Sequence, residues 1–229
     1  MSDPELDRIH ERYERRKHGA TARYSVARPE VFRAMAQVDR VMLRALADLG
    51  LTDFPRLRIL EVGCGDGGNL LRFLRWGADP ANLVGNELLR ERVDLARRRL
   101  PAAVEVRHQD AATLDGEPFD IVLQSTVLSS ILDRGLQEQI AGAMWRLTKP
   151  GGAVLSYDFT FNNPANRDVR KVTAARLAAL FPEGSLTTHR VTLAPPIARR
   201  VGRLGPLHAA LGAVPLLRTH LVATVAKTS

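Results

Sequence analysis

The chain has 229 residues, of which 45% are apolar and 25% are charged, a composition typical of a globular protein and not of a disordered one. Its formal charge of +8 comes almost entirely from arginines scattered along the chain, which favours a compositional bias over a dedicated polyanion-binding surface. The single cysteine, Cys64, excludes an intrachain disulfide and a multi-cysteine metal site, and it fits a cytoplasmic protein.

The first 52 residues are expected to form a helical cap. Residues 4–17 are rich in helix formers but poor in apolar residues, which predicts an exposed or lid-like helix. Residues 28–51 carry apolar side chains at helical spacing, with Gly50 as the stop, which predicts an amphipathic helix. The charged N-terminal stretch lacks the apolar core of a signal peptide, and the apolar stretch at 195–226 is interrupted by Arg, His, Pro and Gly, so no membrane span is predicted.

After Pro55, short β-branched segments alternate with amphipathic helical segments. The strand patterns are "LRILEV", "NLVGNE", "AVEVRHQD", "FDIVLQS", "AVLSYDF", "SLTTHRVTLAP" and "RTHLVATVA". This alternation predicts an α/β fold: a doubly wound, mostly parallel seven-stranded sheet of Rossmann-like type with helices on both faces. A helical segment between the last two strand patterns predicts an edge pair with one antiparallel member.

The stretch "EVGCGDGGN" follows the first strand pattern and opens a helical one. Glycines permit positive φ angles and let a ligand approach the backbone closely, so such a turn suits a phosphate, a ribose or a carboxylate. A dinucleotide enzyme would use G-x-G-x-x-G, whereas Gly63, Gly65 and Gly67 form G-x-G-x-G. The acidic residues Glu61 and Asp66 would repel a pyrophosphate but suit a ligand that carries an ammonium group.

This pattern resembles motif I of class I S-adenosylmethionine (SAM) dependent methyltransferases, and later positions agree with the resemblance. The second strand pattern ends in Glu87, about twenty residues after the glycines. The third is followed by Asp110 and Ala111, Asp120 opens the fourth, and the next helical stretch ends in "LTKPGG". The resemblance covers residues 57–160 well and the flanks in outline.

The resemblance implies that SAM is the cofactor and that it lies against the glycine loop. It places Glu61 near the ammonium of the cofactor's amino acid end, Glu87 at the ribose hydroxyls and Asp110 at the adenine amine. The other residues expected to contact the cofactor are Gly63, Cys64, Gly65, Gly67, Ala111 and Gln124. We expect Cys64 to fill a small slot in the loop and not to act as a nucleophile, because the sequence places no cation beside its thiol.

The methyl acceptor is expected to be a small molecule, more readily methylated at a hydroxyl oxygen than at nitrogen or carbon. A hydroxyl needs a general base or a metal ion to take its proton, and no metal site is predicted. The candidate bases are Asp158, just past the fifth strand, and His18 in the N-terminal cap. Tyr13 and Tyr24 are the candidate acceptor-binding residues.

A single domain of residues 1–229 is expected. Residues 53–160 form its cofactor-binding half, residues 161–229 its acceptor-side half, and residues 1–52 the cap. The N/D-P-P-Y/F motif of many amino-group methyltransferases is missing, since "LQSTV" stands at the end of the fourth strand. This absence and an aromatic content of 5% make nucleic acid an unlikely partner without excluding it.

A natural-product scaffold or a saccharide is the favoured acceptor. The alternatives are N- or C-methylation of a small molecule, methylation of RNA, and a SAM-binding partner or sensor without turnover. A nicotinamide enzyme is the least favoured, because of the glycine spacing.

Overall fold

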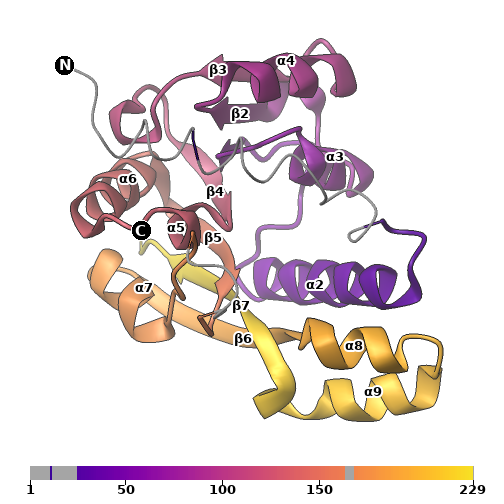
Figure 1. Cartoon of the computed structure of the whole chain (residues 1–229). Helices are drawn as coiled ribbons and strands as arrows, with labels where there is room; N and C mark the ends of the chain where they lie inside the picture. Colours follow the sequence, from indigo (N-terminus) through magenta and orange to yellow (C-terminus); the bar gives the residue numbers. More distant parts are fainter. Residues whose placement is uncertain (1–10, 12–24, 163–167, 229) are drawn as a thin grey trace.

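The computed structural model describes residue 11, residues 25–162 and residues 168–228 (Figure 1). The helix predicted for residues 4–17 therefore lies outside the described residues, except for Glu11, which is helical. Seven strands form one sheet: β1 (Ile59–Val62), β2 (Leu83–Glu87), β3 (Glu105–His108), β4 (Phe119–Ser125), β5 (Thr148–Phe159), β6 (Ser185–Leu193) and β7 (Arg218–Ala226). The α-helices described are α2 (Pro29–Ala47), α3 (Gly68–Arg75), α4 (Arg90–Arg99), α5 (Val127–Ser130), α6 (Arg134–Arg146), α7 (Ala174–Leu180), α8 (Pro195–Val201) and α9 (Gly205–Ala213). Short 3₁₀ turns are η1 (Pro80–Asn82), η2 (Ala111–Thr113) and η3 (Pro215–Leu217).

The strand order in the sheet is β3-β2-β1-β4-β5-β7-β6. Strands β1 to β5 pair in parallel, whereas β7 is antiparallel to both of its neighbours, β5 and β6. The doubly wound, mostly parallel seven-stranded sheet predicted from the sequence is therefore confirmed, and so is the edge pair with one antiparallel member. The order reverses between β1 and β4, which is where a doubly wound fold opens a ligand-binding crevice.

Helices cover both faces of the sheet because successive strand residues point to opposite sides. Ile121 and Leu123 pack in one cluster with residues of α2, α3 and α4. Val122 lies in the other cluster, with residues of α5, α6 and α7. Each buried strand is apolar on both sides as a result, which is the pattern expected of parallel strands between two helical layers.

Helix α2 belongs to one of these helical layers and is more than a cap. It begins with Pro29 at its first position, where a missing N–H costs nothing. Its residues Val38, Met42 and Leu46 are buried against the sheet. Helices α8 and α9 lie side by side next to α2 in Figure 1. None of the described helices combines the length and apolarity needed to cross a membrane.

Strands β4 and β5 are joined at their amino ends by Asp120. Its carboxylate accepts hydrogen bonds from Lys149 Nζ (2.9 and 3.0 Å) and from the backbone N–H of Arg58 (2.8 Å). Gly152 passes so close that a Cβ there would lie 2.6 Å from the carbonyl oxygen of Asp120. The "LTKPGG" segment therefore has a structural role, at the end of the sheet opposite the carboxyl ends of the strands.

Candidate functional site

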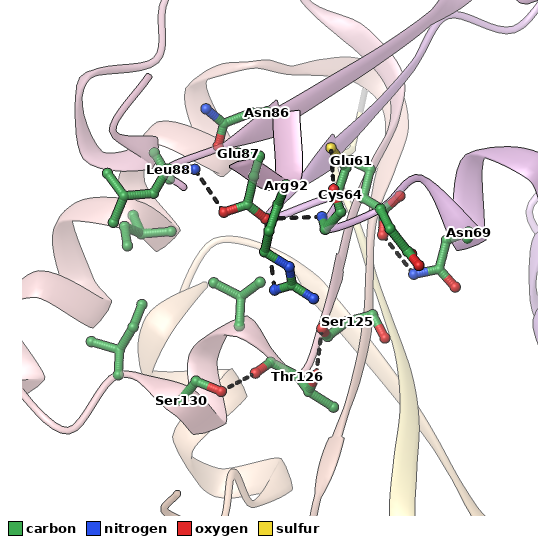
Figure 2. A pocket seen from close by; sticks show the side chains of 18 of the residues that line it. Glu61, Cys64, Asn69, Asn86, Glu87, Leu88, Arg92, Ser125, Thr126 and Ser130 are labelled. Atoms are coloured by element: carbon green, nitrogen blue, oxygen red, sulfur yellow. Dashed lines mark hydrogen bonds and ion pairs between the residues drawn. The ribbon is translucent and has the colours of Figure 1, made fainter. Parts of the chain in front are cut away.

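A cavity with a volume of about 540 Å³ opens at the carboxyl ends of β1, β2 and β4. Figure 2 shows Glu61 and Cys64 from β1 and its loop and Glu87 from β2, with Ser125 and Thr126 from the end of β4 across the space between them. These residues are brought together because β1 pairs with β2 on one side and with β4 on the other. The cavity therefore lies at the reversal of strand order.

The glycine loop between β1 and α3 uses positive φ angles at three positions. Gly63, Gly65 and Gly67 have φ of +66°, +59° and +84°. A Cβ on Gly63 would lie 2.3 Å from Cγ2 of Val127, so this glycine also lets α5 approach the loop. Gly63 and Gly65 line the cavity, whereas Gly67 is buried against Leu100 and does not line it. Gly67 serves the turn into α3, where only glycine fits beside Leu100.

Glu61 is a buried carboxyl group with one unsatisfied oxygen. Its side chain lines the cavity, and Asn69 Nδ2 donates a hydrogen bond to Oε1 (2.5 Å). Oε2 has no hydrogen-bond partner within the described part of the chain. Burial raises the pKa of Glu61 to about 8, against the opposing effects of the Asn69 hydrogen bond and the charge of Arg72. A ligand cation at Oε2 would relieve both the unsatisfied oxygen and the cost of ionisation.

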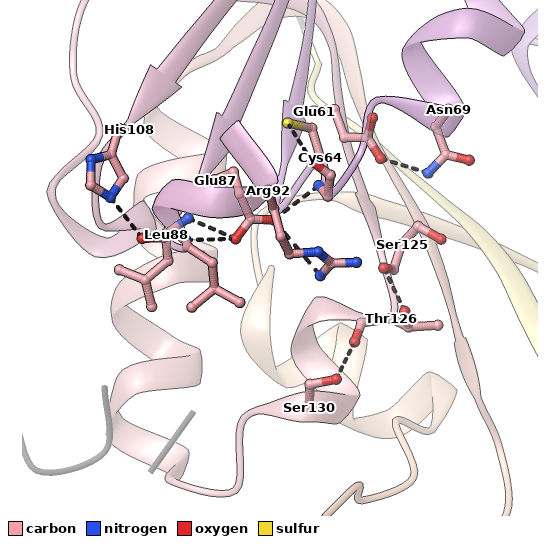
Figure 3. A network of polar contacts seen from close by, with 12 residues as sticks. Glu61, Cys64, Asn69, Glu87, Leu88, Arg92, His108, Ser125, Thr126 and Ser130 are labelled. Atoms are coloured by element: carbon pink, nitrogen blue, oxygen red, sulfur yellow. Dashed lines mark hydrogen bonds and ion pairs between the residues drawn. The ribbon is translucent and has the colours of Figure 1, made fainter. Parts of the chain in front are cut away.

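Glu87 ties the end of β2 to the glycine loop. Its Oε1 accepts hydrogen bonds from the backbone N–H groups of Leu88 (2.8 Å) and Leu89 (2.9 Å), and its Oε2 accepts one from Gly65 (2.9 Å), as Figure 3 shows. Arg92 of α4 brings Nη1 within 4.0 Å of Oε2. The carboxylate faces the cavity, where its remaining lone pairs can accept ligand hydroxyl groups.

Asp110 and Ala111 form the wall of the cavity after β3. One oxygen of Asp110 accepts a hydrogen bond from the backbone N–H of Ala112 (2.9 Å) and begins the turn η2, so the carboxylate is fixed in direction. Both residues line the cavity, and their contact with the cofactor stays a prediction. His108, at the end of β3, makes a ring-nitrogen hydrogen bond to the carbonyl of Leu88 (2.9 Å) at an exposed position.

Cys64 lines the cavity with a buried, unreactive thiol. Burial raises its pKa far above the ordinary range, and the nearby carboxyl groups of Glu61 and Glu87 raise it further. Its Sγ fills the space above Gly85, where a Cβ would lie only 2.8 Å away. These observations support the expected role as a space-filling residue.

Two of the predicted site residues, Gln124 and Asp158, do not line this cavity. Gln124 and Asp158 are 0% and 1% exposed, and neither is among the residues that line the cavity. Gln124 Nε2 donates to Asp158, while Gln124 Oε1 accepts from the N–H groups of Val127 (3.0 Å) and Leu128 (3.3 Å). Asp158 also accepts from the N–H of Ser129 (3.1 Å). Gln124 and Asp158 therefore fix the position of α5, because together they accept hydrogen bonds from three of its backbone N–H groups.

Asp158 lies outside the cavity lining because side chains alternate between the two faces along β5. Asp158 points toward α5, whereas its neighbour Tyr157 points to the other face and lines a second cavity. His220, from the paired strand β7, lines that cavity too. Neither Tyr157 nor His220 was recognised from the sequence, although alternation within "AVLSYDF" would have separated Tyr157 from Asp158.

The remaining candidates lie in the N-terminal segment. Tyr13, His18 and Tyr24 are outside the described residues, so their predicted roles stay predictions. Among the residues that are described, no three His, Cys, Asp or Glu side chains gather as a metal site.

Comparison with known proteins identifies the domain that carries this cavity. Residues 59–152 match the family model described as a methyltransferase domain. A ubiquinone biosynthesis O-methyltransferase of Roseobacter denitrificans is 30% identical over 138 residues, 58% of this chain and 52% of that protein. A tRNA N(3)-cytidine methyltransferase of Gallus gallus is 33% identical over 112 residues, 44% of this chain and 30% of that protein. The matches thus span about half or less of these relatives.

Solved structures share the fold over nearly the whole chain. A 1,6-didemethyltoxoflavin-N1-methyltransferase of Burkholderia thailandensis has a TM-score of 0.63 at 20% identity, with 100% of this chain and 92% of that one covered. The magnesium protoporphyrin IX methyltransferase of Synechocystis PCC 6803, solved with bound SAM, has a TM-score of 0.62 at 13% identity and 99% coverage of both chains. These similarities confirm the predicted fold, and the family match shows that residues 59–152 resemble a methyltransferase domain.

Proposed function

We propose that this chain, which carries a methyltransferase domain, is a SAM-dependent enzyme that methylates a small molecule at a hydroxyl oxygen. The observation that carries the proposal is the cavity between the glycine loop and β2, with the unsatisfied Oε2 of Glu61 at one side and the fixed carboxylate of Glu87 at the other. An ammonium and a pair of ribose hydroxyls, both present in SAM, fit these two groups.

The residues of the cavity would bind and orient the cofactor. Glu61 would accept from its ammonium, Glu87 from its ribose, and Asp110 from its adenine amine, with Gly63 and Gly65 allowing close approach to the backbone. When bound, SAM supplies an activated methyl group with its own leaving group. The protein's part is then alignment of donor and acceptor and exclusion of water.

We further propose that the chain works as a single domain. Residues 53–160 would hold the cofactor, and the acceptor would bind between residues 161–229 and the N-terminal part. The packing of α2 on the same sheet as the cofactor half supports this arrangement. A cytoplasmic location is also proposed, and the free, buried thiol of Cys64 is compatible with it.

The test is transfer of label from methyl-labelled SAM to panels of small hydroxyl compounds, small amines and total RNA. The proposal predicts label on hydroxyl compounds, formation of an equal amount of S-adenosylhomocysteine (SAH), and loss of both in Glu87→Ala. Label found on amines alone would move the acceptor atom to nitrogen. Binding of SAH without label on any panel would point to the non-catalytic alternative.

Methylation of RNA is a second candidate, favoured by the formal charge of +8 and by similarity to a tRNA methyltransferase. Because phosphate contacts release counterions, RNA binding would weaken steeply as salt is raised from 50 to 200 mM. The proposal of a small-molecule acceptor predicts that acceptor binding changes little over this range.

A further inference from the structure

A second cavity, with a volume of about 230 Å³, adjoins the first. The two cavities share the lining residues Met35, Arg72 and Ser125, so a molecule in the second would meet the first at this junction. The second cavity is enclosed by α2, α8 and the carboxyl-terminal part of β5, with β6 and β7. Nothing in the sequence analysis assigned a ligand to it.

The lining of this cavity is mostly apolar. Its apolar residues are Val31, Ala34, Met35, Val38, Leu193, Pro195 and Ala198. A cavity of about 150 Å³ lined by apolar side chains is known to hold benzene, so about 230 Å³ suits one ring with a few substituents. The charged groups are Arg72, Glu30 and Arg199. Arg72 is paired with Asp39 (2.7 Å) and Glu30 with Arg28 (2.9 Å), while Arg199 is exposed to solvent.

The backbone beside this cavity is strained in a way that favours a functional role. Two non-glycine residues of the described chain have positive φ, Thr126 at +60° and Thr192 at +64°. Thr126 lines the first cavity and Thr192 the second. Gln37 of α2 holds Thr192 in place by accepting a hydrogen bond from its backbone N–H (2.8 Å). Strain of this kind costs about 1–3 kcal/mol and is concentrated at functional sites.

His220 and Tyr157 form a polar end within the apolar cavity. Their rings stack, with centroids 5.0 Å apart and an interplanar angle of 6°. The Tyr157 hydroxyl is within 3.2 Å of Thr192 Oγ1. His220 is buried, and burial lowers its pKa to about 4, so its ring is neutral at physiological pH.

The hydrogen bonds around His220 assign its tautomer. One tautomer makes both contacts of Thr219 Oγ1 good hydrogen bonds: Oγ1 donates to the carbonyl of Thr192 (3.4 Å) and accepts from Nδ1–H of His220 (3.0 Å). We assign this tautomer, in which Nδ1 carries the hydrogen and Nε2 carries a lone pair. None of the described residues makes a hydrogen bond to Nε2, so its lone pair is left for a ligand.

We infer that the second cavity binds the methyl acceptor, a small apolar ring compound with a hydroxyl group, and that Nε2 of His220 takes the proton of that hydroxyl. The inference rests on the proposed function. In the transfer, the acceptor oxygen forms a bond to the methyl carbon, the carbon–sulfur bond of the donor breaks with its electron pair on sulfur, and the hydroxyl proton moves to Nε2. His220 thus replaces Asp158 as the candidate base.

The binding part of the inference is tested with 4-methylphenol, titrated into SAH-saturated protein and followed by ligand-observed NMR. Ala34→Phe fills the cavity and should weaken 4-methylphenol binding at least tenfold. Ala36→Phe, on the exposed side of the same helix, is the matched control and should bind as the wild type does. Absence of binding to the wild type, or equal binding by Ala34→Phe, would overturn the inference. Failure of the wild type to bind SAH would instead overturn the proposed function.

The catalytic part is tested by comparing two phenols at pH 8. The hydroxyl of 4-methylphenol is protonated there, whereas that of 4-nitrophenol is largely ionised and needs no base. His220→Asn should slow methylation of 4-methylphenol by about a hundredfold or more and that of 4-nitrophenol much less, since a general base contributes about 10²–10⁴. An equal loss for both phenols would assign His220 a purely structural role. Nitrogen-15 NMR of the wild-type imidazole should show the hydrogen on Nδ1, and a hydrogen on Nε2 would contradict the assignment.

Discussion

Glu61 is the residue whose chemistry the site depends on most directly. In the free protein its pKa is raised to about 8 by burial, so below this pH the carboxyl group is protonated. An ammonium placed at Oε2 favours the carboxylate and lowers that pKa. Binding of SAH should therefore release close to one proton at pH 6.5, and this release should fall as the pH rises past about 8.

Calorimetric titration with SAH in buffers of different ionisation enthalpy measures this proton release. In Glu61→Gln the release should vanish and binding should weaken by about 1.5–3 kcal/mol, the loss expected for a charge-assisted hydrogen bond. Asp53→Asn, an exposed carboxylate outside the cavity, is the control and should keep both quantities. A proton release in Glu61→Gln equal to that of the wild type would separate Glu61 from the ligand.

Gly63 offers a second prediction at the scale of one residue. Gly63→Ala should destabilise the fold by about 2–5 kcal/mol for two reasons. The alanine would have to adopt a left-handed backbone conformation, and its Cβ would clash with Val127. Gly50 has a similar φ of +73° with no atom within 4 Å of an added Cβ, so Gly50→Ala should show the backbone cost alone, about 1–2 kcal/mol. Urea unfolding followed by tryptophan fluorescence gives both values. Equal losses in the two variants would contradict the close approach of α5.

At the scale of elements, Asp158 fixes the start of α5 to β4 and β5. Burial raises its pKa from 3.8 to about 6, so the folded state is less favoured once this group ionises. Its contribution to stability is fully present below pH 3.8, is lost as the pH rises to about 6, and amounts to about 3 kcal/mol or less.

Asp158→Asn cannot ionise and should remove this part of the pH dependence. Urea unfolding of the variant and the wild type at pH 4, 5, 6 and 7 measures the difference. Methyl transfer by the variant should stay within about tenfold of the wild type, in contrast to the hundredfold loss expected of a missing base. A larger loss without a change in stability would restore the catalytic role first predicted for Asp158.

Helix α2 supplies a prediction of its own. Leu46→Ala removes a fully buried side chain from the contact between α2 and the sheet and should cost about 2–5 kcal/mol. Leu95→Ala, at a 38% exposed position on α4, is the control and should cost much less. Chemical unfolding of both variants decides the question. A small loss of unfolding free energy in Leu46→Ala would indicate that α2 is a cap that contributes little to the fold.

The sequence predicted these elements well because their signals are local. The alternation of β-branched and amphipathic segments determined the fold, and the glycine spacing with Glu87 and Asp110 located one wall of the cavity. The sequence did not show that Gln124 and Asp158 lie outside the cavity lining, because a strand end reveals which residues lie near a site but not which face each side chain takes. Tyr157 and His220 come together only through the pairing of β5 with β7, which no local pattern reveals.

For the molecule as a whole, we propose separate roles for the two cavities, one for the cofactor and one for the acceptor. The first lies between the glycine loop and the ends of β2 and β4, and the second lies between α2 and the antiparallel edge pair. This division explains why the residues proposed to hold the cofactor could be predicted from the sequence, whereas those proposed to bind the acceptor could not. The central claim is that the first cavity binds SAM, and every other proposal depends on it.

Calorimetric titration of the purified chain with SAH tests that claim most directly, with NAD(H) as the comparison ligand and Glu87→Ala as the comparison protein. We expect one SAH to bind per chain with a micromolar dissociation constant. Binding should be weaker in Glu87→Ala, and NAD(H) should give no heat. A folded protein, freed of carried-over ligand, that binds neither SAH nor SAM would contradict it.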